Sequence, residues 1–462
     1  MLGIAGPESS SRGILLLMKI RIVPIVLFGL LVAAISEAEG RTLTLEEAVQ
    51  TALDRNERAL AAVEDARAAG ARVRRARAFL FPDLTLSADY TRRSAEDRDR
   101  GEEPGDDGAR ESNEGRVTVN QTLFRAGGFP LLAQARHLRT AAGHEARDEN
   151  RQLAYETAAA FLAVLNEQQV ARAAEERRSL ASRSLHDIEL RFEAQLVGSN
   201  DVTRTELELA SAERELVLAQ GNVRIARHQL GQLLGMDAPD SLAIPANLLA
   251  TASSPDSTGE RRLVDLHRAL SGRPDVQAAR SRVAALRASA SEPLTRYLPE
   301  LGATGSAWSL KETDVAGRRE HWRADLGLTW RVFDGGEREA ERAERLAMAR
   351  SAELLLANLE RRVAVDIEVA ASALERERAS LARAEVALTV ARRNAEESAE
   401  LYRQGLVRAL EVVDANLQLY LAEVERAGAR FSAALALLDL RLASGADPLE
   451  TGTDPRETEG RP

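Results

Sequence analysis

The chain has 462 residues, of which 44% are hydrophobic, 29% are charged and only 4% are aromatic, and it contains no cysteine. The formal net charge of −10 argues against nucleic acid as a main partner, and the lack of cysteine excludes disulfides, thiolate metal sites and an N-terminal lipid-anchored cysteine. A composition dominated by Ala, Leu, Arg and Glu favours long helices over a compact mixed fold.

The N-terminal segment has the features of a secretory signal. Lys19 and Arg21 precede the apolar run IVPIVLFGLLVAAI, and residues 36–38 form a small-x-small cleavage pattern. A transmembrane anchor is the alternative, but the 14-residue run is shorter than the ~20 residues of a spanning helix and contains Pro24. We therefore expect residues 1–38 to be a signal peptide with an upstream extension, and the mature chain to be exported.

Four segments alternate apolar and polar residues and are predicted strands. They are 83–90 (DLTLSADY), 117–124 (VTVNQTLF), 301–310 (LGATGSAWSL) and 324–333 (ADLGLTWRVF). Their length of ~8–10 residues is typical of membrane-spanning strands, although a soluble pair of hairpins has similar dimensions. Near the strand ends lie four aromatic residues that would suit an interfacial girdle: Tyr90, Trp308, Trp322 and Trp330. The polar segments 91–116 and 311–323 are expected loops.

The segments between the strands have helical periodicity. The predicted helices are 56–80, 131–196, 202–234, 275–297, 337–404 and 411–443. At 1.5 Å per residue, the helix at 131–196 would be ~100 Å long, and two shorter helices stacked end to end would nearly match it. The sequence thus predicts a tall wall of helices with coiled-coil-like packing and a pair of β-hairpins at one end.

The chain contains an internal duplication. FLFPDL at 79–84 corresponds to RYLPEL at 296–301, and LFRAGG at 123–128 corresponds to VFDGGE at 332–337. We divide the chain into a first repeat at 39–236, a linker at 237–260, a second repeat at 261–445 and a disordered polar tail at 446–462.

Four strands are too few to close a barrel, which needs about eight. An open sheet edge in lipid would leave backbone groups unpaired. We therefore expect several copies of the chain to share one barrel in contact with lipid.

Each repeat carries a similar turn between two helices, at the far end of the long helix from the strands. The turns read QLVGSNDVTR at 195–204 and GLVRALEVVD at 405–414. Glu411 and Asp414 are three residues apart, which places both carboxylates on one face of a helix. Acids at a helix start also act as N-caps, and for Asp201 capping explains the residue at least as well as a gating role.

These features together resemble the TolC family of outer-membrane efflux proteins. The resemblance runs from LTLEEAVQTAL at 43–53 to LLDLRLASG at 437–445 and includes the FPDL and LPEL strand starts and YRQGLVRALEVVDA at 402–415. It implies a homotrimer with twelve strands in one outer-membrane barrel and a helical tunnel across the periplasm. Such proteins are passive exit ducts of tripartite efflux or type I secretion systems. A periplasmic adaptor docks on them, and an inner-membrane pump of the RND, ABC or MFS type drives transport.

The resemblance also implies roles for residues at the two turns. Glu411 and Asp414 match the periplasmic gate, and Asp201 and Tyr402 match a pair that ties the hairpins together when closed. Arg408 lies one residue away from the position of the family's closing arginine, which Val407 occupies here. Adaptor docking is expected at Leu196, Val197, Gly405, Leu406 and Val407. The first turn has Gln195 where the family usually has glycine.

Two other function classes compete with a channel. The six histidines are scattered and the catalytic motifs of metalloproteases, nucleotide-binding enzymes and serine hydrolases are missing, so we predict no catalytic residue, metal ligand or cofactor. A soluble periplasmic coiled-coil adaptor or scaffold would explain the helices, but it leaves the duplicated strand pairs unexplained.

Overall fold

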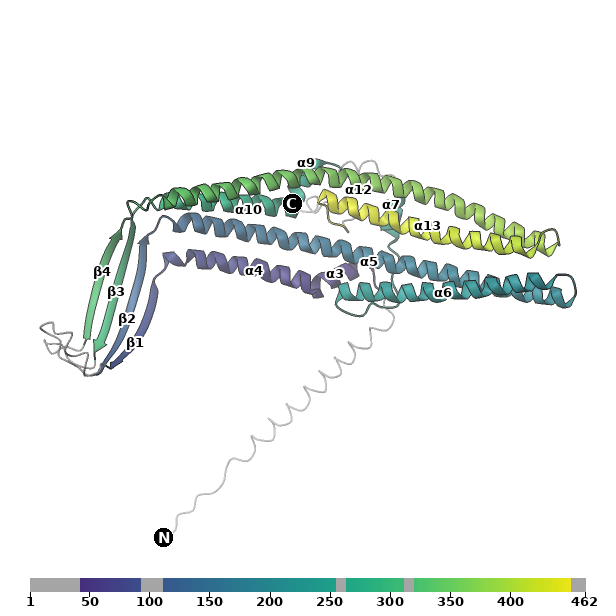
Figure 1. Ribbon diagram of the computed structural model, residues 1–462, viewed down its shortest axis with the longest axis horizontal. Coiled ribbons are helices and arrows are strands. Elements are labelled where there is room, and N and C mark those ends of the chain that lie inside the picture. The colour runs from purple at the N-terminus through teal and green to yellow at the C-terminus, as the bar shows by residue number, and fades with distance from the viewer. Residues whose placement is uncertain (1–41, 93–110, 255–262, 311–319, 450–462) are drawn as a thin grey trace, which may run out of the picture. The chain divides into compact units, whose positions relative to one another are not determined.

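The computed structural model describes residues 42–92, 111–254, 263–310 and 320–449, so the expected signal peptide at 1–38 lies outside the described residues. In each half, helices lead into two strands and then into a long helix and a shorter one, and the strands of both halves form one four-stranded sheet (Figure 1). This confirms the predicted fold class of two mainly helical repeats with four strands.

The helices and strands have the following bounds. The first half contains α3 (Leu45–Arg55), α4 (Glu57–Arg77), the 3-10 turn η1 (Ala78–Leu80), β1 (Asp83–Arg92), β2 (Glu111–Phe124), α5 (Gly128–Glu193) and α6 (Ser199–Leu234). The second half contains α7 (Ala246–Ser253), α9 (Leu266–Gly272), α10 (Pro274–Ala290), α11 (Glu292–Thr295), β3 (Glu300–Leu310), β4 (Glu320–Thr329), α12 (Glu337–Arg403) and α13 (Ala409–Ser444).

The chain forms two compact units, which we describe separately. The hairpin unit comprises Met1–Thr51, Thr157–Ala250 and Leu388–Ala427, and it contains both turns between long helices. The sheet unit comprises Ala52–Glu156, Thr251–Ala387 and Gly428–Pro462, and it contains all four strands.

The sheet is antiparallel throughout, in the order β1-β2-β3-β4. Leu86 pairs with Val117, Val117 with Ala307, and Ala307 with Trp322, so these four residues lie in one row across the sheet. Because side chains alternate along each strand, their face also carries Leu84, Leu326 and Leu328. Leu86 and Trp322 are 78% and 80% exposed in the single chain. The sheet therefore has one apolar face without a cover in the single chain, and one polar face.

Proline sets the boundary between helix and strand in each repeat. Pro82 and Pro299 immediately precede β1 and the Glu300 start of β3. The pair of Glu300 with Thr329 is the last of the ladder between β3 and β4. The ladder ends there because Pro299 has no N–H with which to continue it. Just beyond β4, the Trp330 side chain contacts the segment before β3, since its indole N–H donates to the Tyr297 carbonyl at 3.0 Å.

Two of the predicted strands had wrong boundaries. We expected β4 at 324–333, but it spans Glu320–Thr329, so residues 320–323 belong to a strand and 330–333 do not. We expected β2 at 117–124, but it begins at Glu111. The added residues 111–116 are mostly polar, which suggested a loop, yet they pair with β1 through the whole segment from Arg116 to Glu111.

Several other boundaries also differ from the prediction. The helix expected at 275–297 is divided into α10 and α11 at Ser291, just before Pro293. The linker at 237–260 contains α7. The start of the expected tail is held in place, because the Arg441 guanidinium donates to the Pro448 carbonyl at 3.0 Å; residues 450–462 lie outside the described part.

Small residues allow the helices of the hairpin unit to pack closely. Ala173 and Ala174 of α5, Ala219 of α6 and Tyr420 of α13 form one buried cluster. Within this unit, Arg177 is buried and donates twice to the Glu208 carboxylate, at 2.9 and 3.0 Å. The Arg177 guanidinium also lies over the Tyr420 ring, 5.1 Å from its centre. This contact connects α5 with α13.

Glycine is required for different physical reasons in the two Gly-Gly pairs that follow β2 and β4. A Cβ on Gly128 would lie within 2.4 Å of the Phe79 ring, which packs edge-on against Phe129. Gly335 and Gly336 instead have φ of 72° and 88° with open space around them. The first pair is thus required by close packing and the second by left-handed backbone.

Gly128→Ala should lower the free energy of unfolding by about 1–3 kcal/mol, because the methyl group overpacks against Phe79. Gly143→Ala is the matched control on the same helix, where a Cβ meets nothing within 4 Å. It should stabilise by up to about 1 kcal/mol through helix propensity. Denaturant unfolding of the detergent-solubilised protein measures both; equal effects of the two variants would contradict the packing argument.

Candidate functional site

The first turn joins α5 to α6 through residues 194–198. The Leu196 N–H donates to the Arg191 carbonyl at 2.9 Å, and the Gln195 N–H donates to the Phe192 carbonyl at 2.9 Å. Gln195 has a φ of 58° and is the one non-glycine residue with positive φ among those the structure describes. These features define a Schellman motif, which satisfies the last carbonyls of α5.

The second turn joins α12 to α13 and has the same backbone design. The Leu406 N–H donates to the Leu401 carbonyl at 2.9 Å, and the Gly405 N–H donates to the Tyr402 carbonyl at 3.0 Å. Gly405 has a φ of 76°, which glycine adopts without a steric penalty. The sequence similarity of the two turns therefore reflects one backbone conformation used twice.

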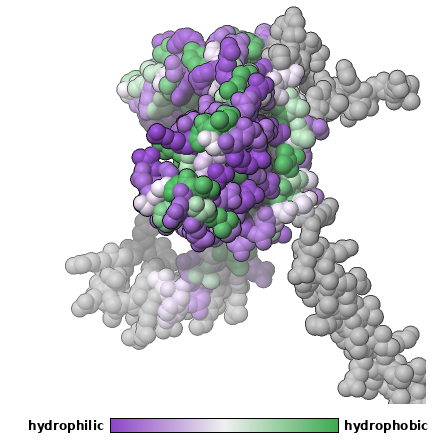
Figure 2. Space-filling model, turned by 90° about the vertical axis from the view of Figure 1, so that its right-hand side faces the viewer, coloured by the Kyte–Doolittle hydropathy of each residue, from purple (hydrophilic) through white to green (hydrophobic). Residues whose placement is uncertain are grey.

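Both turns present a leucine to solvent. Leu196 is 73% exposed and Leu406 is 68% exposed, whereas Val197 and Val407 are half-buried. In the view onto the end of the molecule with these turns, apolar patches are interspersed with hydrophilic surface (Figure 2). Each turn therefore offers an exposed leucine to a partner.

Glu411 and Asp414 occupy the exposed face at the start of α13. Both residues are exposed, and the neighbouring positions Val412 and Ala415 are buried on the other side of the helix. Glu411 is in the first turn of α13, where the helix dipole favours a carboxylate. The packing thus directs both acids away from the helices of the hairpin unit.

Asp201 lies in the first turn of α6, but it is not the N-cap. Gly198 holds that position, and no side chain caps the helix there. The Asp201 carbonyl accepts from the Thr205 hydroxyl at 2.9 Å. The Asp201 side chain therefore does not cap α6 through a hydrogen bond, although its negative charge still stabilises the start of the helix.

Tyr402 contacts an arginine that the sequence analysis missed. The Arg191 guanidinium lies 4.5 Å from the centre of the Tyr402 ring, and Arg191 donates to the Tyr402 carbonyl at 3.5 Å. The Tyr402 hydroxyl makes no hydrogen bond within the described residues, including to Asp201. Arg408 is exposed, and its guanidinium group has no hydrogen-bond or ion-pair partner among the same residues. The cation between the two hairpins is thus Arg191. In the sequence, the one feature that pointed to this residue was its place as a basic residue in the last turn of α5.

The surroundings of Tyr402 change its acidity. Burial raises the pKa of the Tyr402 phenol, and the carboxylates of Asp201 and Asp187 add to the increase. The Arg191 charge acts in the opposite direction, but it does not cancel the increase. The neutral phenol is therefore favoured in the folded chain.

The four aromatic residues expected to form a girdle do not share one face of the sheet. Trp322 lies in the apolar row, and Tyr90 follows Leu86 at even spacing on the same face. Trp330 lies just beyond β4. Trp308 is on the polar face, where its ring stacks on His321 at 5.5 Å and Arg116 covers it at 4.8 Å. The girdle assignment was wrong for Trp308, because the Gly- and Ser-rich β3 gave no clear apolar face.

The described part of the chain contains no helix that is both long and apolar enough to cross a bilayer. It also contains no group of three or more His, Cys, Asp or Glu side chains that could hold a metal ion.

Sequence comparison places the repeats in a known family. The family model "Outer membrane efflux protein" matches residues 48–236 and 266–446, which together make up most of the chain. The chain belongs to the outer membrane efflux protein family. It is thus an efflux channel of the outer membrane, and both the family and the fold are those of channel proteins. No curated protein matches the chain in sequence.

Solved outer-membrane channels share this fold at low sequence identity. The Campylobacter jejuni CmeC outer membrane channel is 17% identical, with a TM-score of 0.71, and the match covers 90% of this chain and 88% of that one. The Vibrio cholerae outer membrane protein VceC is 16% identical, with a TM-score of 0.71 and coverage of 87% and 96%. The open state of the Neisseria gonorrhoeae MtrE outer membrane channel is 20% identical, with a TM-score of 0.67 and coverage of 87% and 89%.

Gln195→Gly should stabilise the protein by about 1 kcal/mol, because it removes the steric penalty of a left-handed backbone at a side-chain-bearing residue. Gly405→Gln is the reciprocal variant at the matching position and should destabilise by a similar amount. The midpoints of denaturant unfolding measure both changes. Two shifts of the same sign would contradict the equivalence of the turns.

The raised pKa of Tyr402 predicts a loss of stability in alkali. The folded pKa lies above the unfolded value of about 10, so this contribution is complete below pH ~10 and is lost as the pH rises through the folded pKa. Arg191→Gln should raise the Tyr402 pKa further, and Asp201→Asn should lower it. Ultraviolet titration of each protein against its Tyr402→Phe counterpart isolates this phenol. A Tyr402 pKa that neither variant moves would show that neither charge acts on it.

Proposed function

We propose that three copies of this chain form one exit duct, with the sheets joined in a twelve-stranded barrel and the helices in the periplasm. The observation that carries this proposal is the four-stranded sheet with one apolar face. Within the described residues, β1 and β4 each pair on one side only. Joining β4 of one copy to β1 of the next would pair both edges and turn the apolar faces toward lipid.

Exposed apolar side chains on the helices support the same assembly. On α6, Leu207, Leu218 and Ile225 are exposed at spacings of 11 and 7 residues. These spacings keep the side chains on one side of a helix in a coiled coil. A neighbouring copy is the natural cover for such a stripe in a protein that assembles through its sheet edges.

The turns are the proposed periplasmic mouth of the duct. α5 and α12 are unbroken helices of 66 and 67 residues, and each lies between a strand and a turn along the chain. If the strands are in the outer membrane, the turns belong in the periplasm. The exposed Leu196 and Leu406, with the adjoining Val197, Gly405 and Val407, are then the proposed contacts for the adaptor. The adaptor connects the duct to an inner-membrane pump.

Glu411 and Asp414 are the proposed constriction of the closed mouth. Three chains would place six carboxylates around one axis, where their negative potentials add. Such a ring favours cations, and its oxygens bind divalent ions, which block the pore. The contact between Arg191 and Tyr402 joins α5 to α12 within one chain and is the proposed tie between the hairpins. An adaptor that separates the hairpins would break this tie and widen the ring.

Planar-bilayer recording of the detergent-extracted protein tests the function and the gate together. The parent should be a trimer by native mass spectrometry and should form a cation-selective pore that divalent ions block. Glu411→Gln/Asp414→Asn should weaken cation selectivity and divalent block while the trimer persists. Glu206→Gln/Glu213→Gln removes two exposed acids from α6 and is the charge-matched control. A monomeric parent would refute the duct, and unchanged block in the first variant would place the constriction elsewhere.

A further inference from the structure

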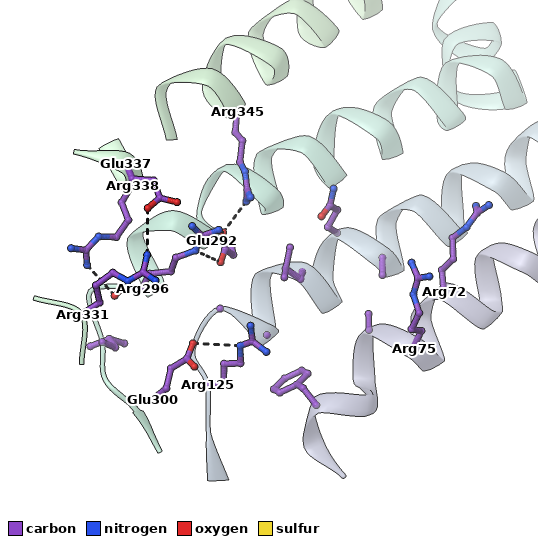
Figure 3. A pocket seen from close by; sticks show the side chains of 18 of the residues that line it. Arg72, Arg75, Arg125, Glu292, Arg296, Glu300, Arg331, Glu337, Arg338 and Arg345 are labelled. Atoms are coloured by element: carbon purple, nitrogen blue, oxygen red, sulfur yellow. Dashed lines mark hydrogen bonds and ion pairs between the residues drawn. The ribbon is translucent and has the colours of Figure 1, made fainter. Parts of the chain in front are cut away.

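A cleft of about 890 Å³ lies in the sheet unit, where α4, α5, α11 and α12 approach the ends of β3 and β4 (Figure 3). The volume is sufficient for a small molecule. Seven arginines line it: Arg72, Arg75, Arg125, Arg296, Arg331, Arg338 and Arg345. Four acids accompany them: Glu292, Glu300, Asp334 and Glu337. The lining therefore has three more positive than negative charges, in a chain whose net charge is −10.

A buried carboxylate organises one side of the cleft. The Glu292 side chain is 7% exposed and accepts from Arg296 at 2.8 Å and from Arg345 at 3.0 Å. Both arginines also pair with Glu341 on α12. A Cβ on Gly127 would come within 3.0 Å of the Glu292 carboxylate, so the glycine makes room for this network. These two arginines are neutralised and held in place.

Three further arginines of the lining have carboxylate partners. Arg338 pairs with Asp334 at 2.5 Å, Arg331 with Glu337 at 3.3 Å, and Arg125 with Glu300 at 3.4 Å. The first pair is almost fully buried, and the Arg338 charge and hydrogen bond hold the pKa of Asp334 below its usual value although burial alone would raise it. The Arg338–Asp334 pair is thus fixed by burial, and the other two pairs are exposed but still partner their arginines.

Arg72 and Arg75 differ from the other five arginines. They are exposed and three residues apart on α4, and neither guanidinium group makes a hydrogen bond or ion pair within the described residues (Figure 3). Two like charges at this spacing repel each other. An anion between them would form charge-assisted hydrogen bonds and relieve that repulsion. The excess charge of the cleft is therefore concentrated in two guanidinium groups that are available to a ligand.

The cleft belongs to the polar side of the sheet. Glu300 and Thr329 line it and pair with each other, and the next pair along the strands, Leu301 with Leu328, is on the apolar face. Because side chains alternate along a strand, Glu300 and Thr329 are on the polar face. Phe79, Leu131 and Leu138 add an apolar wall. Such a site suits a soluble anion with some apolar surface better than it suits a lipid headgroup beside the apolar face.

We propose that this cleft binds the carboxylate or phosphate groups of anionic efflux cargo, with Arg72 and Arg75 as the ligand-binding residues. The identification of the ligand as cargo rests on the proposed duct, whereas anion binding by the cleft does not. The cleft then holds anionic cargo where the helices meet the strands, before it passes along the polar face of the sheet.

Calorimetric titration of the detergent-solubilised protein with sodium pyrophosphate tests the site, with tricarballylate as the carboxylate probe. Arg72→Gln/Arg75→Gln should weaken binding of both probes by about tenfold or more. Arg74→Gln/Arg77→Gln is the matched control, because it removes the same charge from the same helix but from residues that line a different groove. This control should change the affinity by less than about twofold, and added salt should weaken binding to the parent.

Three results would overturn the proposal: no binding by the parent, equal loss in both double variants, or no loss in the first. A phospholipid that co-purifies with the parent, is lost in Arg72→Gln/Arg75→Gln and is not displaced by pyrophosphate would assign the cleft to lipid instead. Bilayer conductance separates this test from the duct itself. A parent that conducts but binds neither probe refutes only the cleft, and a parent that binds both but does not conduct refutes the duct.

Discussion

Backbone hydrogen bonding at the edges of a four-stranded sheet is the constraint on which the rest of the structure depends. β1 and β4 are the outer strands of this sheet, and one of its faces is apolar. In hydrocarbon, each unpaired N–H or C=O costs several kcal/mol, so an edge of ten residues cannot be left open. In the duct proposed above, pairing with further copies would satisfy both edges, and the same neighbours would cover the exposed apolar stripes of the helices.

The duplicated halves show that one sequence motif can have two physical causes. Gly128 is required because the Phe79 ring occupies the space of a Cβ, whereas Gly335 is required because its backbone is left-handed. The helix turns show the reverse case, because Gln195 and Gly405 differ in sequence but share one conformation. Duplication has therefore preserved the backbone conformation at the helix turns, whereas at the Gly-Gly pairs it has preserved the residues but not the conformation.

Periodicity and proline placement were sufficient to predict the order of elements, because both act through local backbone geometry. Long helices, four strands and the two turns followed from residues such as Pro82 and Pro299. Features that depend on long-range contacts were missed. Arg191 and Tyr402 are 211 residues apart, so no local pattern could pair them. Trp308 was expected in the aromatic girdle but lies on the polar face, which the Gly- and Ser-rich sequence of β3 did not reveal. Residues 111–116 were expected to be a loop because they are mostly polar, yet they pair with β1.

The proposed mouth and cleft have opposite charge, and this has a consequence for anionic cargo. The exposed Glu411 and Asp414 would repel an anion while three chains hold them close, whereas Arg72 and Arg75 would attract it. The repulsion falls with distance and is screened over about 8 Å at physiological ionic strength. Widening the proposed mouth beyond that length would weaken the electrostatic barrier and reduce the steric one. In this proposal, separation of the hairpins admits the anion, and the cleft then provides the attraction that the mouth lacks.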